Sequence, residues 1–253
     1  MGEFFALSPR WQLLIIAAGV AICFALSSII FWRARKTGSD AVPVGPFFVT
    51  ATTMFALMFS FLAVELWRLN DRAQLAHNQE RTALSRLHET SHFDRFDLSE
   101  IASLAATYQE RVVDDEWGQS RNREATPEVD AIIHDIRRIV VNAAFDGLAS
   151  PVASDLISAV NMLENARVER LTIGGNDHGS FKWVGVIVLV VLSHIAIAMV
   201  HADRPRAGRR ALGLFGTVTL FVFWLLSIYA NPYAGGVRID PDFDGIHMSY
   251  GPE

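Results

Sequence analysis

Residues 46–87 read PFFVTATTMFALMFSFLAVELWRLNDRAQLAHNQERTALSRL, and this stretch decides the fold of the chain. It begins with about twenty mostly apolar residues and continues, without an internal proline or glycine, into a polar segment with heptad-like spacing. An α-helix rises about 1.5 Å per residue and the hydrocarbon core of a bilayer is about 30 Å thick, so about twenty residues cross it. The stretch therefore predicts one continuous helix that crosses a membrane and projects into water.

Three further apolar runs have membrane length. Together with the start of the first stretch they predict four spans, at residues 11–32, 46–67, 183–200 and 211–230. Tryptophan stands at several run ends, where an indole can keep its ring in the membrane interface and its N–H in water. The first run is longer than the apolar part of a secretion signal, so we expect it to be retained as an anchor.

The segment between the second and third spans has the start signals of helices. Thr126–Pro127 and Ser150–Pro151 each join an N-cap residue to a proline at the first helical position, and Asp97 with Glu100 has the form of a capping box. No strand pattern occurs there. The predicted fold is all-α, with four transmembrane helices and an extramembrane helical bundle inserted between the second and third spans.

Four regions follow from this fold. Residues 1–68 hold the first two spans, residues 69–181 form a soluble helical domain continuous with the second span, and residues 182–230 hold the last two spans. Residues 231–253 form an acidic tail rich in glycine and proline.

The charge distribution predicts the orientation in the membrane. The connector at residues 33–40 holds three basic residues and the connector at 203–210 holds four, each against a single aspartate. Short loops rich in lysine and arginine stay in the cytoplasm. The soluble domain and both termini are therefore predicted on the periplasmic side of a bacterial inner membrane. The formal net charge of −5 and the acidic soluble domain argue against nucleic-acid binding.

The acidic run Asp114, Asp115 and Glu116 stands near a predicted helix end, where negative charge opposes the helix dipole. We expect an arginine to compensate it. The candidates are Arg111, Arg137, Arg138, Arg167 and Arg170.

Several segments together resemble a bacterial membrane family named bestrophin-like, whose function is unknown. They are AVELWRLNDRAQLAHNQERTALSRL (63–87), YQERVVDDEWGQ (108–119), ENARVERL (164–171) and NPYAGGVRIDP (231–241), in the family's order. The family is named for distant kinship to bestrophins, which are oligomeric anion channels with aromatic residues on the pore face of the second span. A bestrophin-type topology would put the soluble part in the cytoplasm, whereas the charges put it outside.

The second span carries the candidate pore-lining side chains. Phe48, Phe55 and Phe59 share one face at helical spacing, and Leu62 continues it. Such a face can form a hydrophobic constriction that gates by dewetting. Lipid contact or packing against other helices is the commoner role of an aromatic stripe.

Glu65 lies near the outer end of the same span. Ionisable groups in a span usually face protein or water, so Glu65 is a candidate selectivity residue that would favour cations. An interfacial carboxylate with Arg68 as its partner is the alternative.

The other intramembrane polar candidates are Thr53, Ser60 and His194. Thr53 and Ser60 belong, with Ala56 and Ala63, to a small-residue face that suits close helix contact.

His194 lies near the middle of the third span, and a histidine at that depth needs a partner. We expect a hydrogen bond to Thr217 or Thr219 of the fourth span, with a proton-linked gate as the alternative.

In the tail, Asp240, Asp242 and Asp244 are spaced like the opening of a calcium loop. The twelfth position is Gly251 instead of glutamate, so a turn-rich acidic tail is the competing interpretation. We expect no other metal and no cofactor.

The sequence contains no recognisable catalytic motif, and we do not expect an enzyme. The predicted function is a homo-oligomeric, bestrophin-like ion channel or pore that passes small ions, with the second span lining the axis. The alternative is a non-conducting membrane scaffold or sensor whose acidic helical domain binds a partner. An intramembrane enzyme ranks third.

Overall fold

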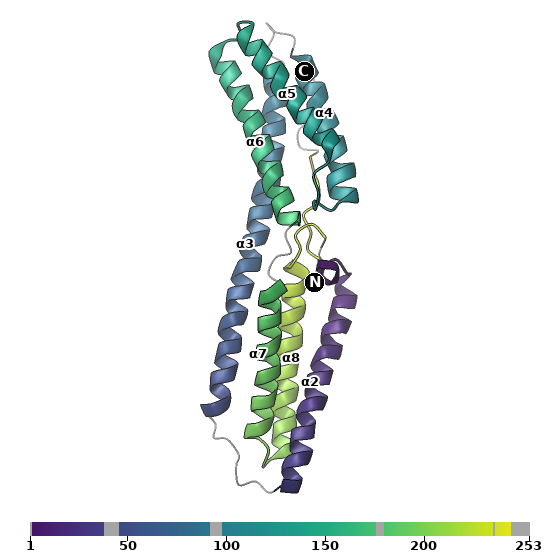
Figure 1. Ribbon diagram of the computed structural model, residues 1–253, viewed down its shortest axis with the longest axis vertical. Coiled ribbons are helices and arrows are strands. Elements are labelled where there is room, and N and C mark those ends of the chain that lie inside the picture. The colour runs from purple at the N-terminus through teal and green to yellow at the C-terminus, as the bar shows by residue number, and fades with distance from the viewer. Residues whose placement is uncertain (1, 38–45, 92–97, 176–179, 235, 244–253) are drawn as a thin grey trace, which may run out of the picture. The chain divides into compact units, whose positions relative to one another are not determined.

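The computed structural model describes residues 2–37, 46–91, 98–175, 180–234 and 236–243, and most of these are helical, with no strand among them (Figure 1). The helices are α1 (Gly2–Phe5), α2 (Pro9–Thr37), α3 (Pro46–Ser91), α4 (Ser99–Arg111), the π-helical segment η1 (Val112–Gln119), α5 (Pro127–Phe145), α6 (Ser150–Gly175), α7 (Ser180–Val200) and α8 (Pro205–Tyr229). The all-α prediction is thus confirmed.

Four helices are long and apolar enough to cross a bilayer, as the sequence predicts. Their candidate spans are Pro9–Ile30, Phe48–Ser91, Phe181–Val200 and Pro205–Tyr229. The second of these is longer than a span requires because it includes the polar half of α3.

The helix α3 has no break between its apolar and polar halves. Its 46 residues correspond to a rod of about 69 Å at a rise of about 1.5 Å per residue. After Pro46 it contains neither proline nor glycine, the residues that most often end or kink a helix. The chain therefore forms the continuous helix that residues 46–87 predict, ending at Ser91.

The chain folds into two compact units. The membrane unit comprises Met1–Arg68 and Asp177–Val237, and the helical unit comprises Leu69–Asn176 and Arg238–Glu253. The helix α3 contributes to both, and residues 231–253 are divided between them.

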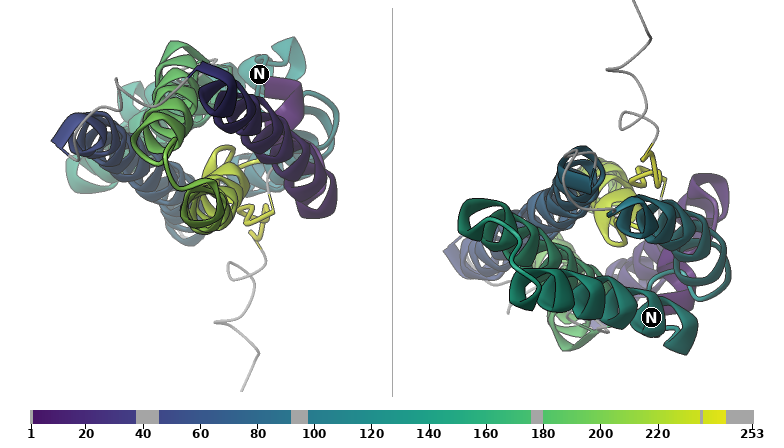
Figure 2. Two further views of the ribbon diagram at one scale, coloured as in Figure 1. Left: turned by 90° about the horizontal axis from the view of Figure 1, so that it is seen from below. Right: turned by 90° about the horizontal axis from the view of Figure 1, so that it is seen from above.

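In the membrane unit, α2, α7 and α8 lie side by side (Figures 1 and 2). The membrane half of α3 turns one face toward them, with Leu62, Ala63 and Leu66 in a core shared with Trp183 and Phe223. The other side of this half of α3 is exposed among the described residues.

The helical unit consists of the polar half of α3 together with α4, η1, α5 and α6, which are visible from above in Figure 2. Small and branched residues at spacings of three and four give α3 its buried face, which includes Ala73, Ala76, Ala83, Leu84 and Leu87.

Two helices in this unit begin where the sequence predicts them. Thr126 is the N-cap of α5, with Pro127 at the first helical position, and α6 begins at Ser150 and ends at Gly175. Asp97 lies outside the described residues, so the capping box predicted there stays a prediction.

Candidate functional site

The phenylalanine stripe of α3 packs inside the membrane unit. The ring centroid of Phe55 lies 5.8 Å from that of Phe59 and 5.7 Å from that of Phe215 on α8. Phe59 in turn lies 6.3 Å from Phe223, also on α8. In the single chain these rings hold α3 against α8, and a role for them in lining a pore stays a prediction.

The ends of the stripe have similar surroundings. Leu62 is 4% exposed and belongs to the core with Phe55. Phe48 packs against a smaller core that contains Ile197 and Leu212.

The opposite face of α3 is not covered by any of the residues that the structure describes. Thr53, Leu57, Ser60 and Val64 are all exposed, and their spacing of four, three and four residues places them on one side of the helix. The Ser60 hydroxyl donates to the Ala56 carbonyl oxygen at 2.8 Å. This face mixes hydroxyl and aliphatic groups and is available for contact with lipid, water or a second copy.

Glu65 forms an ion pair with Lys182 of α7, and each side chain is 47% exposed. The sequence suggests Arg68 as the neighbouring partner, but the structure pairs Glu65 with a lysine 117 positions away. The reason is that α7 begins beside the point where α3 leaves the membrane unit. The negative charge of Glu65 is therefore compensated by the positive charge of Lys182.

His194 is buried between α7 and α8, and it bonds within its own helix. Its Nδ1 lies 2.9 Å from the Val190 carbonyl oxygen, and its ring lies 4.9 Å from that of Phe215. The expected bond to Thr217 or Thr219 is wrong, because the Thr217 hydroxyl donates to the Gly213 carbonyl oxygen instead. Among the described residues, neither His194 Nε2 nor the Thr219 hydroxyl has a hydrogen-bond partner.

The tail offers little support for calcium. Asp240 is exposed and accepts a hydrogen bond from Arg238 Nε at 3.0 Å, and Asp244 lies outside the described residues. Within the described ranges, no group of three histidine, cysteine, aspartate or glutamate side chains could hold a metal ion.

The largest concentration of buried charge lies in the helical unit and centres on Arg170 of α6. Arg170 Nε donates to Glu80 Oε2 at 2.8 Å, and its Nη2 donates to Glu80 Oε1 at 3.0 Å and to Glu116 Oε2 at 2.8 Å. All three side chains have no solvent exposure. One guanidinium thus joins carboxylates from α3 and η1.

Arg167, one turn earlier on α6, completes the pairing. Its Nη2 donates to Glu116 Oε1 at 2.6 Å, and its Nη1 donates to Asp130 of α5. Arg167 Nε also donates to Glu116 Oε1 at 3.0 Å, and the backbone N–H of Thr126 donates to the same oxygen at 3.1 Å. Arg167 and Arg170 were among the arginines expected to compensate the acidic run, and this expectation is confirmed for Glu116.

Two uncharged side chains extend the network. The Tyr108 hydroxyl donates to Glu80 Oε1 at 2.6 Å, and the Asn122 side-chain oxygen accepts from Arg170 Nη1. Asn122 has a φ of 58°, in the left-handed region that asparagine tolerates better than most residues. We define the buried charge network as Glu80, Tyr108, Glu116, Asn122, Arg167 and Arg170.

The pKa values within this network follow from its geometry. Burial by itself would raise the pKa of the Glu116 carboxyl, but hydrogen bonds from Arg167 and the charge of Arg170 outweigh it and lower the pKa. Burial likewise opposes the charge of Arg170, yet Glu80 outweighs it and raises the pKa of the guanidinium. For Tyr108, burial and the nearby Glu80 both raise the pKa of the phenol. These shifts favour a charged Glu116, a charged Arg170 and a neutral Tyr108.

The π-helical turn brings both Glu116 and Trp117 into the interior. In η1, Val112, Glu116 and Trp117 are buried. A π-helix bonds i to i+5, so residues five apart lie closer to one face than in an α-helix. The guanidinium carbon of Arg170 lies 5.6 Å from the centre of the Trp117 ring, which adds a cation–π contact.

Two other arginines of the expected set pair elsewhere. Arg137 pairs with Glu164, and Arg138 pairs with Asp135 at 2.9 Å. Sequence analysis did not identify Glu80 or Asn122. A glutamate at an otherwise apolar position, four residues after Ala76 and three before Ala83, is the signal that could have found Glu80.

Comparison with known families decides the assignment. A family model described as a bestrophin-like domain matches residues 14–243, which is most of the chain. The chain belongs to the bestrophin-like family. No curated protein and no solved structure matches it.

Three of the segments that resemble the bestrophin-like family meet in the buried charge network. Glu80 comes from residues 63–87, Tyr108 and Glu116 come from residues 108–119, and Arg167 and Arg170 come from residues 164–171. In this bestrophin-like protein the shared segments therefore build the interior of the helical unit.

Proposed function

We propose that this membrane protein of the bestrophin-like family assembles into a homo-oligomer and conducts small ions, with α3 around the axis. The observation that supports this proposal is the exposed face of α3, which consists of Thr53, Leu57, Ser60 and Val64. This role is one of transport and not of catalysis.

The chemistry of that face suits a narrow pore. Rings of aliphatic side chains can form a dewetting constriction, while hydroxyl groups offer polar steps to a passing ion. Small residues such as Thr53, Ala56 and Ser60 also let helices from neighbouring copies approach closely. In this proposal the phenylalanine stripe supports α3 from within the chain, and the four uncovered residues face the axis.

We also propose that the helical unit and both termini lie on the periplasmic side of a bacterial inner membrane. The connection between α7 and α8 and the first turns of α8 carry Arg204, Arg206, Arg209 and Arg210, which favour a cytoplasmic position. A cysteine at exposed Gln74, introduced into a Cys23→Ala background, should react with an impermeant maleimide in intact spheroplasts. Labelling only after the membrane is broken would show that the helical unit lies on the cytoplasmic side instead.

Conduction is tested on the purified full chain in planar bilayers. In a Cys23→Ala background, which removes the single native cysteine, Ser60→Cys should yield a current that a charged methanethiosulfonate reagent blocks. Ser28→Cys on α2 is a matched control, because Ser28 and Ser60 both donate to the carbonyl oxygen four residues earlier. Its current should be insensitive to the reagent.

Oligomeric state is measured in parallel by mass photometry in nanodiscs. A monomeric, non-conducting protein would refute the channel and favour the scaffold or sensor alternative. A current blocked equally at Ser28 and Ser60 would refute α3 as the pore-lining helix.

A further inference from the structure

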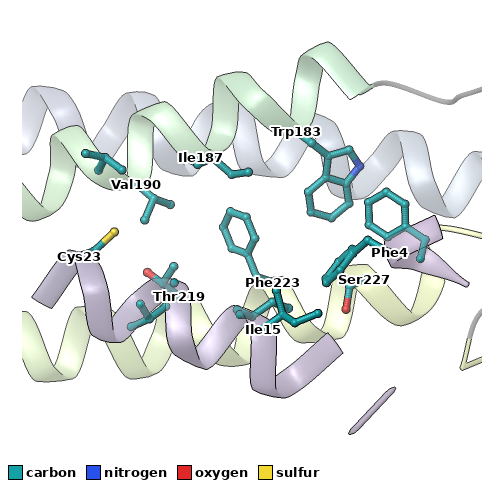
Figure 3. Close-up of a pocket in the computed structure, with 14 residues that line it drawn as sticks. Phe4, Ile15, Cys23, Trp183, Ile187, Val190, Thr219, Phe223 and Ser227 are labelled. Atoms are coloured by element: carbon teal, nitrogen blue, oxygen red, sulfur yellow. The ribbon is translucent and has the colours of Figure 1, made fainter. Parts of the chain in front are cut away.

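The membrane unit contains a cavity of about 310 Å³ between α2, α7 and α8, with Phe4 and Phe5 of α1 at one end (Figure 3). On α2 it extends from Ile15 to Cys23, and on α8 from Thr219 to Ser227. Eight residues of helix rise about 12 Å, so the cavity is elongated along the helix axes. An elongated cavity of this kind fits a linear alkyl chain better than a flat ring system.

No residue that lines the cavity is charged. The lining consists of Phe4, Phe5, Ile15, Ile16, Gly19, Val20, Cys23, Trp183, Ile187, Val190, Val191, Thr219, Phe223 and Ser227. An ionised group would lose its hydration there without gaining a counter-charge, at a cost of several kcal/mol. Apolar atoms would gain dispersion contacts with the same walls. The chemistry therefore selects an uncharged, mostly apolar ligand.

Two polar groups in the lining have a donor without a hydrogen-bond partner among the described residues, the Thr219 hydroxyl and the Trp183 indole N–H. Thr219 is 2% exposed, and its hydroxyl has no hydrogen-bond partner among the described residues. A helical threonine commonly donates to the carbonyl oxygen four residues earlier, as Thr172 and Thr217 do here. The Thr219 oxygen instead points toward the cavity in Figure 3. A buried hydroxyl of this kind gains from an acceptor supplied by a ligand.

At the opposite end of the cavity the Ser227 hydroxyl is already paired, whereas the Trp183 indole N–H has no partner among the described residues. The Ser227 hydroxyl donates to Gln12 Oε1 at 3.0 Å, and Gln12 Nε2 donates to the Phe5 carbonyl oxygen at 3.2 Å. A ligand therefore finds a hydroxyl donor at Thr219, apolar walls beyond it, and the rings of Phe5 and Trp183, with the Trp183 indole N–H, at the other end.

We propose that this cavity binds a single alkyl chain carrying one uncharged oxygen acceptor, with that oxygen on the Thr219 hydroxyl. Alcohol, ester and protonated carboxyl groups share the required chemistry. The ligand reaches the site from the bilayer, because every lining residue belongs to the membrane unit. This site is independent of ion conduction and goes beyond the function proposed above.

The test uses 11-bromoundecanol and the full chain in detergent, since bromine quenches tryptophan fluorescence on contact and Trp183 lines the cavity. Wild-type protein should show saturable quenching. Gly19→Leu should weaken the apparent affinity at least tenfold, because a Cβ at Gly19 meets no atom within 4 Å and the larger side chain can enter the cavity. Gly213→Leu, at an equally open position outside the lining, is the matched control and should bind as wild type does.

Thr219→Val removes the hydroxyl and keeps the shape of the side chain. It should weaken the alcohol about tenfold and leave 1-bromoundecane, which lacks the oxygen, unchanged. Ionised 11-bromoundecanoate should bind more weakly than the alcohol to wild-type protein. Equal quenching of wild type, Gly19→Leu and Gly213→Leu would overturn the site, and equal binding of alcohol and bromoalkane would overturn the role of Thr219.

A phospholipid brominated in its acyl chain distinguishes the sources. Saturable quenching by that lipid, sensitive to Gly19→Leu, would assign the site to a bilayer lipid. Quenching by the alcohol alone would assign it to a free single-chain amphiphile. A melting temperature of Gly19→Leu below that of Gly213→Leu would mean that the substitution destabilises the fold. In that case the comparison of wild type with Thr219→Val, and of the alcohol with the bromoalkane and the carboxylate, tests the site without the Gly19→Leu variant.

Discussion

Arg170 and Glu80 form a two-pronged ion pair across 90 positions of the chain, with Nε to Oε2 at 2.8 Å and Nη2 to Oε1 at 3.0 Å, and both side chains are fully buried. The pair joins α3 to α6 in the interior of the helical unit. The Tyr108 hydroxyl also donates to Glu80, and Glu116 accepts from Arg170, so both members of the buried pair have further hydrogen-bond partners and avoid much of the desolvation penalty.

Removing the cation should destabilise the helical unit strongly. Arg170→Met leaves Glu80 and Glu116 buried without their shared donor, and breaking a buried pair costs about 3–5 kcal/mol. Hydrogen exchange at amides of α6 should accelerate by a factor of about 10² to 10⁴. Arg72→Met, which breaks the exposed pair between Arg72 and Glu169, is the control and should change exchange less than tenfold. Similar exchange in both variants would contradict the network's role.

His77 should make stability depend on pH just below neutrality. Its ring is buried against Trp117 and Phe243, and burial lowers its pKa from the ordinary value of 6.5, although the charge of Glu80 pulls the other way. Between the folded pKa and 6.5 the unfolded chain binds more protons, so this contribution is complete above 6.5 and is lost as the pH falls through that window.

The measurement is the apparent melting temperature of the full chain from pH 7.5 to pH 5. His77→Phe, which cannot take up a proton, should flatten the decline in melting temperature toward pH 5. Substitution of exposed His134 by glutamine should leave the slope as in wild type. An unchanged slope in His77→Phe would assign the pH dependence to other groups.

Gly174 should not tolerate a methyl group. A Cβ at this position would overlap the carbonyl of Asn122 and come within 2.8 Å of the Asn122 Cβ. Because Asn122 accepts a hydrogen bond from Arg170, the shift would also loosen the buried charge network. Gly174→Ala is expected to cost about 1–3 kcal/mol, read from hydrogen exchange of α6.

Gly213→Ala is the control for the ordinary effect of replacing a helical glycine. A Cβ there meets nothing within 4 Å, so the change should be neutral or stabilise by up to about 1 kcal/mol. Equal effects of the two substitutions would show that the contact between α6 and Asn122 is unimportant.

In the proposed channel, neutralising Glu65 and neutralising Lys182 should shift the ion preference in opposite directions. Glu65→Gln leaves the lysine charge in excess and should shift the reversal potential toward anion preference, while Lys182→Gln should shift it toward cations. The double substitution should return close to wild type. Reversal potentials in a salt gradient measure all three, and identical values would place both residues away from the ion path.

The sequence by itself determined the helices and the membrane spans. The length of the apolar runs sets the number of spans, and the absence of a breaker between Pro46 and Ser91 makes α3 continuous. Both are local properties, because helix formation and transfer into a bilayer depend on residues within a few turns.

Partners of individual side chains depended on the tertiary structure. Periodicity gives the face of a residue and not its neighbour, so it could not select Lys182 for Glu65 or turn the phenylalanine stripe toward α8. It also could not foresee that a π-helical turn brings Glu116 to Arg167 and Arg170. Pairings between residues far apart in the chain are decided by how whole helices pack, and only the three-dimensional arrangement contains that information.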